Sequence, residues 1–148
     1  MSTNETELKI KALGEAVLRK KAKPVLRVTD EHRKLLSRMA QIMYAAKGIG
    51  LAANQIGISE SLAVIDSGTG LYKVINPKII KKEGGQVMEE GCLSIPGVTV
   101  KVKRALKVTV EAWDENGKPV TIKAENLLAC IFQHEIDHLN GKLIIDHG

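Results

Sequence analysis

The sequence predicts an α+β fold, because two helical segments flank a long region of strand-like residues. Apolar residues recur at helical spacing within residues 29–47 and again within residues 125–140. Between them, residues 62–124 form short β-type runs separated by turn residues. The chain of 148 residues has no internal repeat and no linker, so we expect a single domain over residues 1–148, with residues 1–7 mobile.

The first helix is predicted over residues 29–47. Thr29 occupies the position of an N-cap, and Asp30 and Glu31 place negative charge in the first turn, where the helix dipole favours it. Gly48 is the expected end of the helix, because glycine readily adopts the left-handed conformation that closes a helix. The apolar face is formed by residues at three- and four-residue spacing: Leu35, Leu36, Met39, Ile42, Met43 and Ala46.

The middle of the chain is predicted to contain two β-hairpins. Leu62–Asp66 and Leu71–Asn76 flank a Ser-Gly-Thr-Gly turn. Ala105–Trp113 and Lys118–Ala124 flank an Asp-Glu-Asn-Gly turn, which is typical of a tight connection between antiparallel strands.

A further strand and a second helix complete the predicted elements. Val98, Val100 and Val102 alternate with polar residues, as in a strand with one buried face. The second helix is predicted over residues 125–140, with Gly141 ending it.

Composition excludes several classes of protein. Apolar residues make up 44% and charged residues 26%, which is a globular composition, and the two cysteines exclude a disulfide scaffold. Aromatic residues make up 3%, so a stacking platform for single-stranded nucleic acid is not expected. The net charge is +5, but the basic residues are not interleaved with aromatic residues as they are in many RNA-binding surfaces. No apolar run approaches the ~20 residues of a membrane helix. The polar start of the chain does not resemble a secretion signal, so we expect a cytoplasmic protein with no direct nucleic-acid function and no membrane contact. A bacterial protein, a phage-encoded protein in a bacterial host and the mature form of an organellar protein all fit this expectation.

The second predicted helix contains the sequence H-E-x-x-H, formed by His134, Glu135 and His138. Two histidines four residues apart project from one helical face and can bind one metal ion. Glu135 lies about 100° round the helix from His134, within reach of a water molecule on that metal. Leu127 and Ile131 lie on the same stripe, so the histidines continue a buried apolar face.

A metal site of this kind needs a third protein ligand. In the pattern H-E-x-x-H-x-x-G-x-x-H the third histidine position is occupied by Ile144, and His147 comes three residues too late, in a tail that we expect to fray together with Asp146. The strongest upstream candidate is Cys92, which follows Gly91 in the sequence Glu-Gly-Cys-Leu-Ser, because a thiolate is a strong ligand for Fe, Zn, Co or Ni. We interpret the other cysteine, Cys130, as a core residue.

Residues 48–57 form a third distinctive segment, Gly-Ile-Gly-Leu-Ala-Ala-Asn-Gln-Ile-Gly. It does not match a phosphate-binding loop, since it has no Lys-Ser/Thr pair and follows a helix. Together, G-I-G-L-A-A-N-Q, E-G-C-L-S and Q-H-E-I-D-H-L-N-G closely resemble the three signature motifs of the peptide deformylase family, in the family's order. The resemblance extends through residues 18–25, 75–77 and 116–119, and covers most of the chain.

The resemblance implies a metal-dependent hydrolase that removes the N-formyl group from the initiator methionine of nascent polypeptides and releases formate. It implies one divalent metal, Fe²⁺ in the cell with Zn²⁺, Ni²⁺ or Co²⁺ as substitutes, held by Cys92, His134 and His138. By the same resemblance Glu135 is the general base and later the proton donor. The fold it implies consists of mostly antiparallel β-sheets packed around a central helix that carries H-E-x-x-H, without a long C-terminal helix in this chain.

The remaining site residues also follow from the resemblance. Gln55 and the backbone N–H of Leu93 would stabilise the oxyanion. The methionine side chain would enter an apolar pocket above His134, and the peptide would lie extended as an added strand. The residues expected to bind the substrate in these ways are Ile49, Gly50, Met88, Gly91, Leu127 and Ile131.

Two positions depart from the family pattern and motivate alternatives. Lys47 stands where many members have an acidic residue, and Thr99 stands where many have an arginine, so a relative with altered formylated substrates is one alternative. A metalloprotease that uses the same helix is a second, which a Cys92→Ala variant would distinguish because a protease would keep its metal. A non-enzymatic metal- or RNA-binding module is a third. Transient ribosome contact is an additional expectation.

Overall fold

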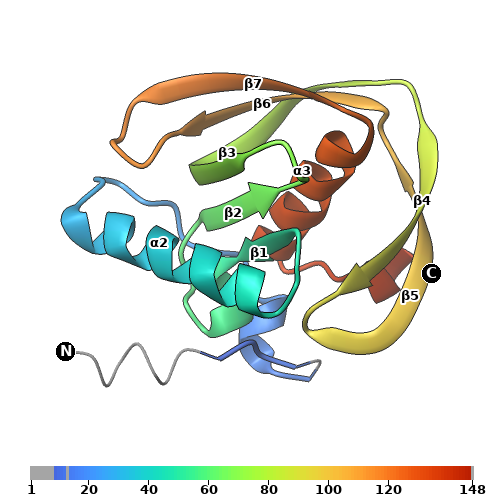
Figure 1. Ribbon diagram of the computed structural model, residues 1–148, viewed down its shortest axis with the longest axis horizontal. Helices are drawn as coiled ribbons and strands as arrows, with labels where there is room; N and C mark the ends of the chain where they lie inside the picture. The colour runs from blue at the N-terminus through green and yellow to red at the C-terminus, as the bar shows by residue number, and fades with distance from the viewer. Residues whose placement is uncertain (1–8, 13, 148) are drawn as a thin grey trace.

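A computed structural model describes residues 9–12 and 14–147, so the predicted mobility of residues 1–7 lies outside the described residues. Within them, the strands form a five-stranded sheet in the order β1-β2-β3-β6-β7 and a two-stranded sheet of β4 and β5 (Figure 1). Each neighbouring pair of strands in both sheets is antiparallel, so the predicted α+β fold with mostly antiparallel sheets is confirmed. In chain order the elements are η1 Ala16–Arg19, α2 Asp30–Ala45, β1 Gly50–Ala52, η2 Ala53–Ile56, β2 Leu62–Asp66, β3 Leu71–Glu83, β4 Gln86–Cys92, β5 Ile95–Arg104, β6 Lys107–Trp113, β7 Pro119–Glu125, α3 Asn126–Leu139 and η3 Ile144–His147.

Helix α2 lies where the first helix is predicted. Thr29 is its N-cap, and the backbone N–H of Thr29 donates to Nδ1 of His32 at 3.0 Å. The predicted end at Gly48 is wrong, because the left-handed residue is Lys47, with φ of +58°. The N–H of Gly48 then returns to the carbonyl of Met43 at 2.9 Å, which satisfies a carbonyl that the helix end would otherwise leave unpaired.

Both predicted hairpins are confirmed, as the pairs β2–β3 and β6–β7. Strand β3 continues well beyond its predicted end at Asn76, with register shifts that accommodate Asn76 in a left-handed conformation. The expected half-buried pattern of β5 is only partly correct: Val102 is fully buried, whereas Val98 is 41% exposed where the strand lines a cavity. Strands β1 and β4 were not predicted, since β1 is only three residues long and β4 is interrupted by polar residues.

Helix α3 begins one residue after its predicted start and ends one residue before its predicted end. It packs against strands of both sheets, so that most of its surface is covered (Figure 1). Phe132 and Ile136 face the main hydrophobic core, which also contains Ile65 of β2 and Val110 of β6. The interior of the molecule is therefore built around the helix that contains H-E-x-x-H.

The segment after α3 differs from the expected fraying tail. Leu143 and Ile144 are buried, and Asp146 forms an ion pair of 2.6 Å with Arg19. Gly141, with φ of +79°, packs so closely on the chain that an added Cβ would lie 2.5 Å from the carbonyl oxygen of Arg19. The C-terminal segment thus folds back against the N-terminal turn η1.

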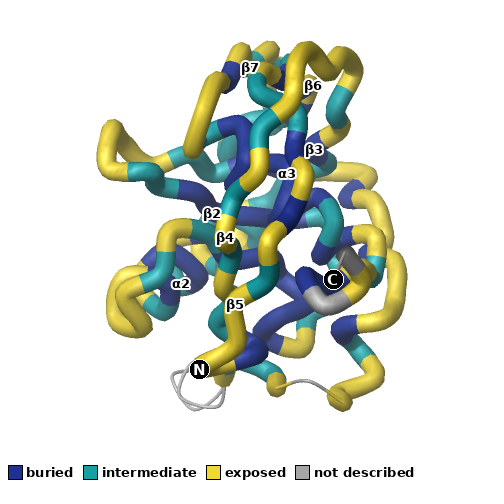
Figure 2. The backbone as a smooth tube through the Cα atoms, turned by 90° about the vertical axis from the view of Figure 1, so that its right-hand side faces the viewer, coloured by how far each residue is buried: buried dark blue, intermediate teal, exposed yellow. Residues whose placement is uncertain are grey.

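The two-stranded sheet lies at the surface of the molecule. Figure 2 shows β4 and β5 facing the viewer, with exposed stretches along both strands. In the part of the chain that is described, no helix has the length and apolar character needed to span a membrane.

Candidate metal centre

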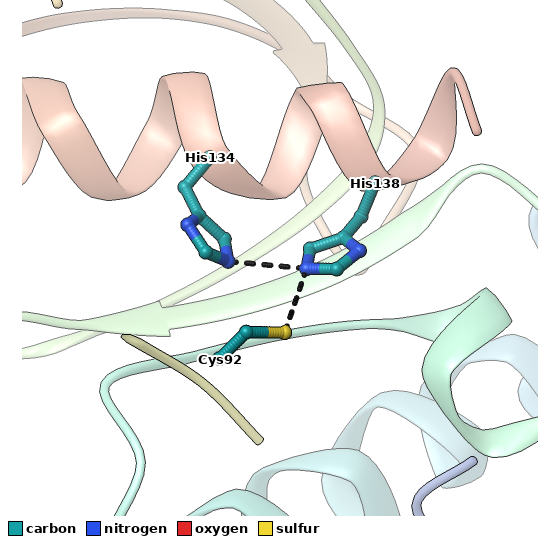
Figure 3. Close-up of side chains that lie close together, drawn as sticks. All are labelled: Cys92, His134 and His138. Atoms are coloured by element: carbon teal, nitrogen blue, oxygen red, sulfur yellow. Dashed lines mark hydrogen bonds between the residues drawn. The ribbon is translucent and has the colours of Figure 1, made fainter. Parts of the chain in front are cut away.

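Three side chains from two separate elements converge beneath the β4–β5 sheet. Nε2 of His138 lies 3.2 Å from Sγ of Cys92 and 3.1 Å from Nε2 of His134 (Figure 3). The three potential ligand atoms all lie within 4.8 Å of one another. One thiol sulfur and two imidazole nitrogens aimed at a common point suit a divalent transition metal, so the donor set fits the metal that the sequence predicts.

Helix geometry and a strand irregularity bring these ligands together. His134 and His138 lie one turn apart on the buried face of α3. Cys92 is the last residue of β4, where the register with β5 shifts between Gly91 and Cys92. Such a bulge redirects a side chain at the end of a strand, and here the thiol of Cys92 points towards the helix (Figure 3). Burial and the neighbouring His134 lower the pKa of His138 to about 3, which keeps this ring in the neutral form that binds metals.

A charged network holds His134 from the opposite side of its ring. Nδ1 of His134 lies 2.9 Å from Oε1 of Glu90, and Arg104 donates to both carboxylate oxygens of Glu90, at 2.9 and 2.8 Å. Arg104 also donates to Asp137 at 2.6 Å. Burial raises the pKa of Glu90, but the hydrogen bonds and charges of Arg104 and His134 outweigh it and lower this pKa to about 2. A carboxylate on Nδ1 leaves Nε2 free to bind a metal.

Gln55 lies beside the three converging ligands. Its Oε1 accepts a hydrogen bond from the backbone N–H of Ala52 at 2.9 Å, which orients the amide. Its Nε2 then donates to Sγ of Cys92 at 3.5 Å and to Oγ of Ser94 at 3.3 Å. Gln55 is 1% exposed, so its position is fixed by the turn η2 that follows β1.

Glu135 is buried next to the same centre. Its Oε2 lies 3.8 Å from Nε2 of His134, and its Oε1 has no hydrogen-bond partner among the described residues. Burial is the largest influence on this carboxyl and raises its pKa to about 7. Gly50 makes room for it, because a Cβ at this position would lie 2.5 Å from Oε2 of Glu135. A buried carboxylate with a free oxygen is suited to accept and return a proton.

A cavity of about 510 Å³ opens beside this centre. It is lined by His134, Glu135 and Gln55, and by Leu93, which packs close to Gly48. The structure brings all the residues predicted to bind substrate to the same cavity: Ile49, Gly50, Met88, Gly91, Leu127 and Ile131. Leu127 is 40% exposed rather than part of a fully buried stripe, because it lies at the open side of this cavity.

Glu90, Ser94 and Asp137 surround the candidate ligands, and the sequence did not indicate these contacts. Glu90 and Asp137 carry the ion pairs of Arg104, whose partners were not predicted. Their positions offer a clue, since Glu90 lies two residues before Cys92 and Asp137 directly before His138. Cys130 is buried as expected, and burial raises the pKa of its thiol to about 11, although it also lines the cavity.

The fold and the centre together define a class of protein. An α+β chain in which a buried H-E-x-x-H helix, a thiol and a carboxylate meet beside a cavity has the construction of a metal-dependent hydrolase.

Comparisons with known proteins identify the family. Residues 7–148 match the family model described as polypeptide deformylase. The chain is 54% identical over 141 residues to the peptide deformylase of Halothermothrix orenii, covering 94% of this chain and 92% of that protein. The crystal structure of peptide deformylase from Thermotoga maritima superposes with a TM-score of 0.93 at 43% identity, over 95% of this chain and 96% of that one. A probable peptide deformylase from Synechococcus phage S-SSM7 superposes with a TM-score of 0.91 at 38% identity, over 95% and 99% of the two chains. The chain therefore belongs to the polypeptide deformylase family, whose members are metal-dependent enzymes that remove the formyl group from nascent peptides.

Proposed function

We propose that this protein hydrolyses the formyl group from the initiator methionine of nascent polypeptides and releases formate. The observation that carries the proposal is the convergence of Cys92, His134 and His138, next to a cavity that is lined by Glu135 and Gln55 together with two of these three residues. Membership of the family supports the reaction, and the geometry supports the roles of the residues.

The metal is held by Cys92, His134 and His138 in this proposal. When bound, it supplies a water molecule with a lowered pKa and a positive charge near the reacting oxygen. One soft thiolate among two imidazoles suits Fe²⁺ in the cell, with Zn²⁺, Ni²⁺ or Co²⁺ as substitutes. Glu90 orients His134 through Nδ1, so that Nε2 faces the other two ligands.

Glu135 removes the proton from the attacking water in our proposal and later delivers it to the leaving amine. Its free Oε1 and its pKa near neutrality suit both steps. The formyl oxygen gains negative charge during attack, and Gln55 Nε2 and the backbone N–H of Leu93 are the donors that we assign to it. A buried and preoriented donor of this kind typically contributes ~2.7–4 kcal/mol to transition-state stabilisation.

The apolar part of the cavity accepts the methionine side chain in this scheme. Ile49 and Leu127 are 47% and 40% exposed, and such large apolar side chains at an open cavity favour an apolar occupant. Met88 and Ile131 complete the wall. The outer edge of β1 has no strand partner among the described residues, so an extended peptide can pair with Ile49 and Gly50 on one side and approach Gly91 on the other.

Three further parts of the proposal depend on the same activity. An enzyme whose substrates are nascent chains would act in the cytoplasm and make transient contact with the ribosome. We also assign the whole chain, residues 1–148, to one catalytic domain, since the family match spans residues 7–148.

The direct test is formate release from formyl-Met-Ala-Ser by protein prepared anaerobically with Fe²⁺ or Ni²⁺. We expect rapid release, and loss of this activity in Glu135→Gln with metal content unchanged. No formate from a folded and metal-loaded protein would disprove the proposal. A Cys92→Ala variant tests the metalloprotease alternative, because a protease that relies on the two histidines would retain its metal, whereas we expect loss of metal and activity together.

A further inference from the structure

Lys47 lies at the mouth of the cavity, at the end of helix α2. It is exposed and belongs to the residues that line the cavity, and Gly48, Ile49 and Gly50 follow it along the same wall. Its backbone is left-handed, with φ of +58°, a position at the end of a helix where glycine is usually favoured. A lysine here costs some local stability, so its side chain is a candidate for a role that glycine could not fill.

The ammonium group of Lys47 is a cation at this cavity without an ion-pair partner in the described part of the chain. Among the cavity-lining residues that the structure describes, Lys47 is the one lysine or arginine, and no ion-pair partner is found for it in that part of the chain. Of the three acidic residues that line the cavity, two are bound to a cation or buried, and the exposed Glu89 bonds a neutral hydroxyl. Glu90 is bound by Arg104, and Glu135 is enclosed next to His134, while Glu89 accepts a hydrogen bond from the hydroxyl of Thr99 at 3.1 Å. A carboxylate brought to the mouth would therefore find one free cation.

The position of the centre determines which part of a substrate reaches Lys47. The formyl end must lie beside Glu135, and Glu135 contacts the wall at Gly50. A peptide that starts there and leaves on the side of Lys47 passes the turn of residues 47–49 that precedes β1. Lys47 lies three residues before Gly50, and three residues span at most about 10 Å, which is also the length of about three residues of an extended peptide, so a side chain at the third residue comes within reach of the exposed Lys47 side chain.

We propose that Lys47 selects nascent chains with an acidic side chain at the third residue. This inference rests on the proposed deformylase activity and adds a substrate preference to it. The ion pair forms at an exposed rim, where such pairs are weak and sensitive to salt. The selectivity is therefore a modest bias among formylated chains rather than a requirement, and it acts on substrate binding.

The test uses three peptides that differ only at the third residue, each with an amidated C-terminus to remove the terminal carboxylate. The peptides are formyl-Met-Ala-Asp-Ala-amide, formyl-Met-Ala-Asn-Ala-amide and formyl-Met-Ala-Lys-Ala-amide. For the metal-loaded protein we expect kcat/KM for the Asp peptide to exceed that for the Asn peptide by about two- to fivefold, and the Lys peptide to be poorest. The difference should appear in KM rather than kcat. It should shrink in 0.5 M NaCl, because added salt shortens the distance over which charges interact, down to ~3 Å at about 1 M.

Two variants connect the preference to this side chain. Lys47→Asn retains a residue that tolerates the left-handed backbone but removes the charge, and should make the three peptides equivalent. Lys47→Glu should reverse the order of the Asp and Lys peptides. Lys34→Glu makes the same change of net charge on an exposed residue near the start of α2, and should leave the order unchanged.

The inference is overturned if the parent protein hydrolyses all three peptides with equal kcat/KM, or if its preference persists in Lys47→Asn. Absence of formate from every peptide would instead overturn the proposed function, and this inference with it. The two failures are distinguishable because only the second abolishes turnover of formyl-Met-Ala-Asn-Ala-amide.

Discussion

Replacing Gly50 with alanine should displace the carboxylate of Glu135 and remove most of the activity. The added Cβ would lie 2.5 Å from Oε2, 2.9 Å from Cδ and 3.0 Å from Cγ of Glu135. The backbone of Gly50 has no positive φ, so alanine is not strained for conformational reasons. The clash with Glu135 is thus the main consequence of this substitution.

The size of the effect follows from the displacement that relieves this clash. Ordinary van der Waals contact begins at 3.4 Å, so Oε2 must move by about 1 Å or β1 must move by the same amount. The strand is held by its ladder with β2 and by the bond from Asp66 N–H to the carbonyl of Ile49, 2.9 Å long. A misplacement of about 1 Å at a reacting group can cost ~10²-fold in rate, and loss of a general base costs ~10²–10⁴-fold. We therefore expect kcat to fall by about 10²-fold or more.

The assay is formate release from formyl-Met-Ala-Ser, with metal content and thermal unfolding measured on the same samples. Gly50→Ala should retain its metal, because the three atoms nearest to the added carbon all belong to Glu135 and none to a proposed ligand. Gly85→Ala is the matched control, since a Cβ there meets no atom within 4 Å, and it should be fully active. If folded, metal-loaded Gly50→Ala turned over within a few-fold of the parent, either Glu135 would not be the base or its position would not matter, and the proposed mechanism would be wrong.

Three further predictions concern stability. Against the opposing effect of burial, Arg104 and His134 together lower the pKa of Glu90 from 4.5 to about 2, so the Glu90 carboxylate contributes about 3 kcal/mol above pH 4.5, and this stability is lost as the pH falls towards 2. Urea unfolding of the metal-free protein, compared with metal-free Glu90→Gln, should show a difference of about this size at pH 6 and a smaller one at pH 3. Lys47→Gly should raise the free energy of unfolding by up to about 1 kcal/mol, measured by the same method, and a loss would show that its left-handed backbone is not a strain. If free metal stood at 100 times its Kd, removal of the metal by a chelator should lower the Tm by roughly 5–10 °C. A Tm unchanged by chelation would argue against a bound metal. Chelation should lower the Tm of Cys92→Ala by less than that of the parent protein.

The elements that could be located from the sequence are those marked by a regular spacing of apolar residues or by turn residues. Apolar spacing of three and four residues located α2 and α3 to within two residues at each end, and turn residues located both hairpins. Strand β1 is too short to show a period, and β4 alternates Val87 and Glu89 outward with Met88 and Glu90 inward, so its inner face is half polar. Glu90 binds Arg104 and His134, and that pairing replaces the apolar residue that a strand's inner face would otherwise carry.

The site was predictable where function depends on residue type and spacing within one element. The helical spacing of His134 and His138 predicted one shared metal, Cys92 was the strongest of a few candidates for the third ligand, and the three side chains do lie together. Contacts between elements that are distant in the sequence produce no regular spacing of residues from which they could be predicted. The bond from Asn54 Nδ2 to the carbonyl of His138 and the two ion pairs of Arg104 depend on how η2, β5 and α3 pack, which no local spacing records.

Arg104 links the two elements that carry the proposed metal ligands. It bonds Glu90, two residues before Cys92 on β4, and Asp137, the residue before His138 on α3. Its side chain is 4% exposed, and burying these charges carries a desolvation cost that a hydrophobic replacement would avoid. What the ion pairs provide is direction, because a bidentate guanidinium fixes the strand that carries the thiol against the helix that carries the imidazoles. The same Glu90 also holds Nδ1 of His134. One buried cation therefore sets the spacing between β4 and α3 and, through Glu90, the orientation of the His134 ring. A core packed only with apolar side chains could not specify that orientation.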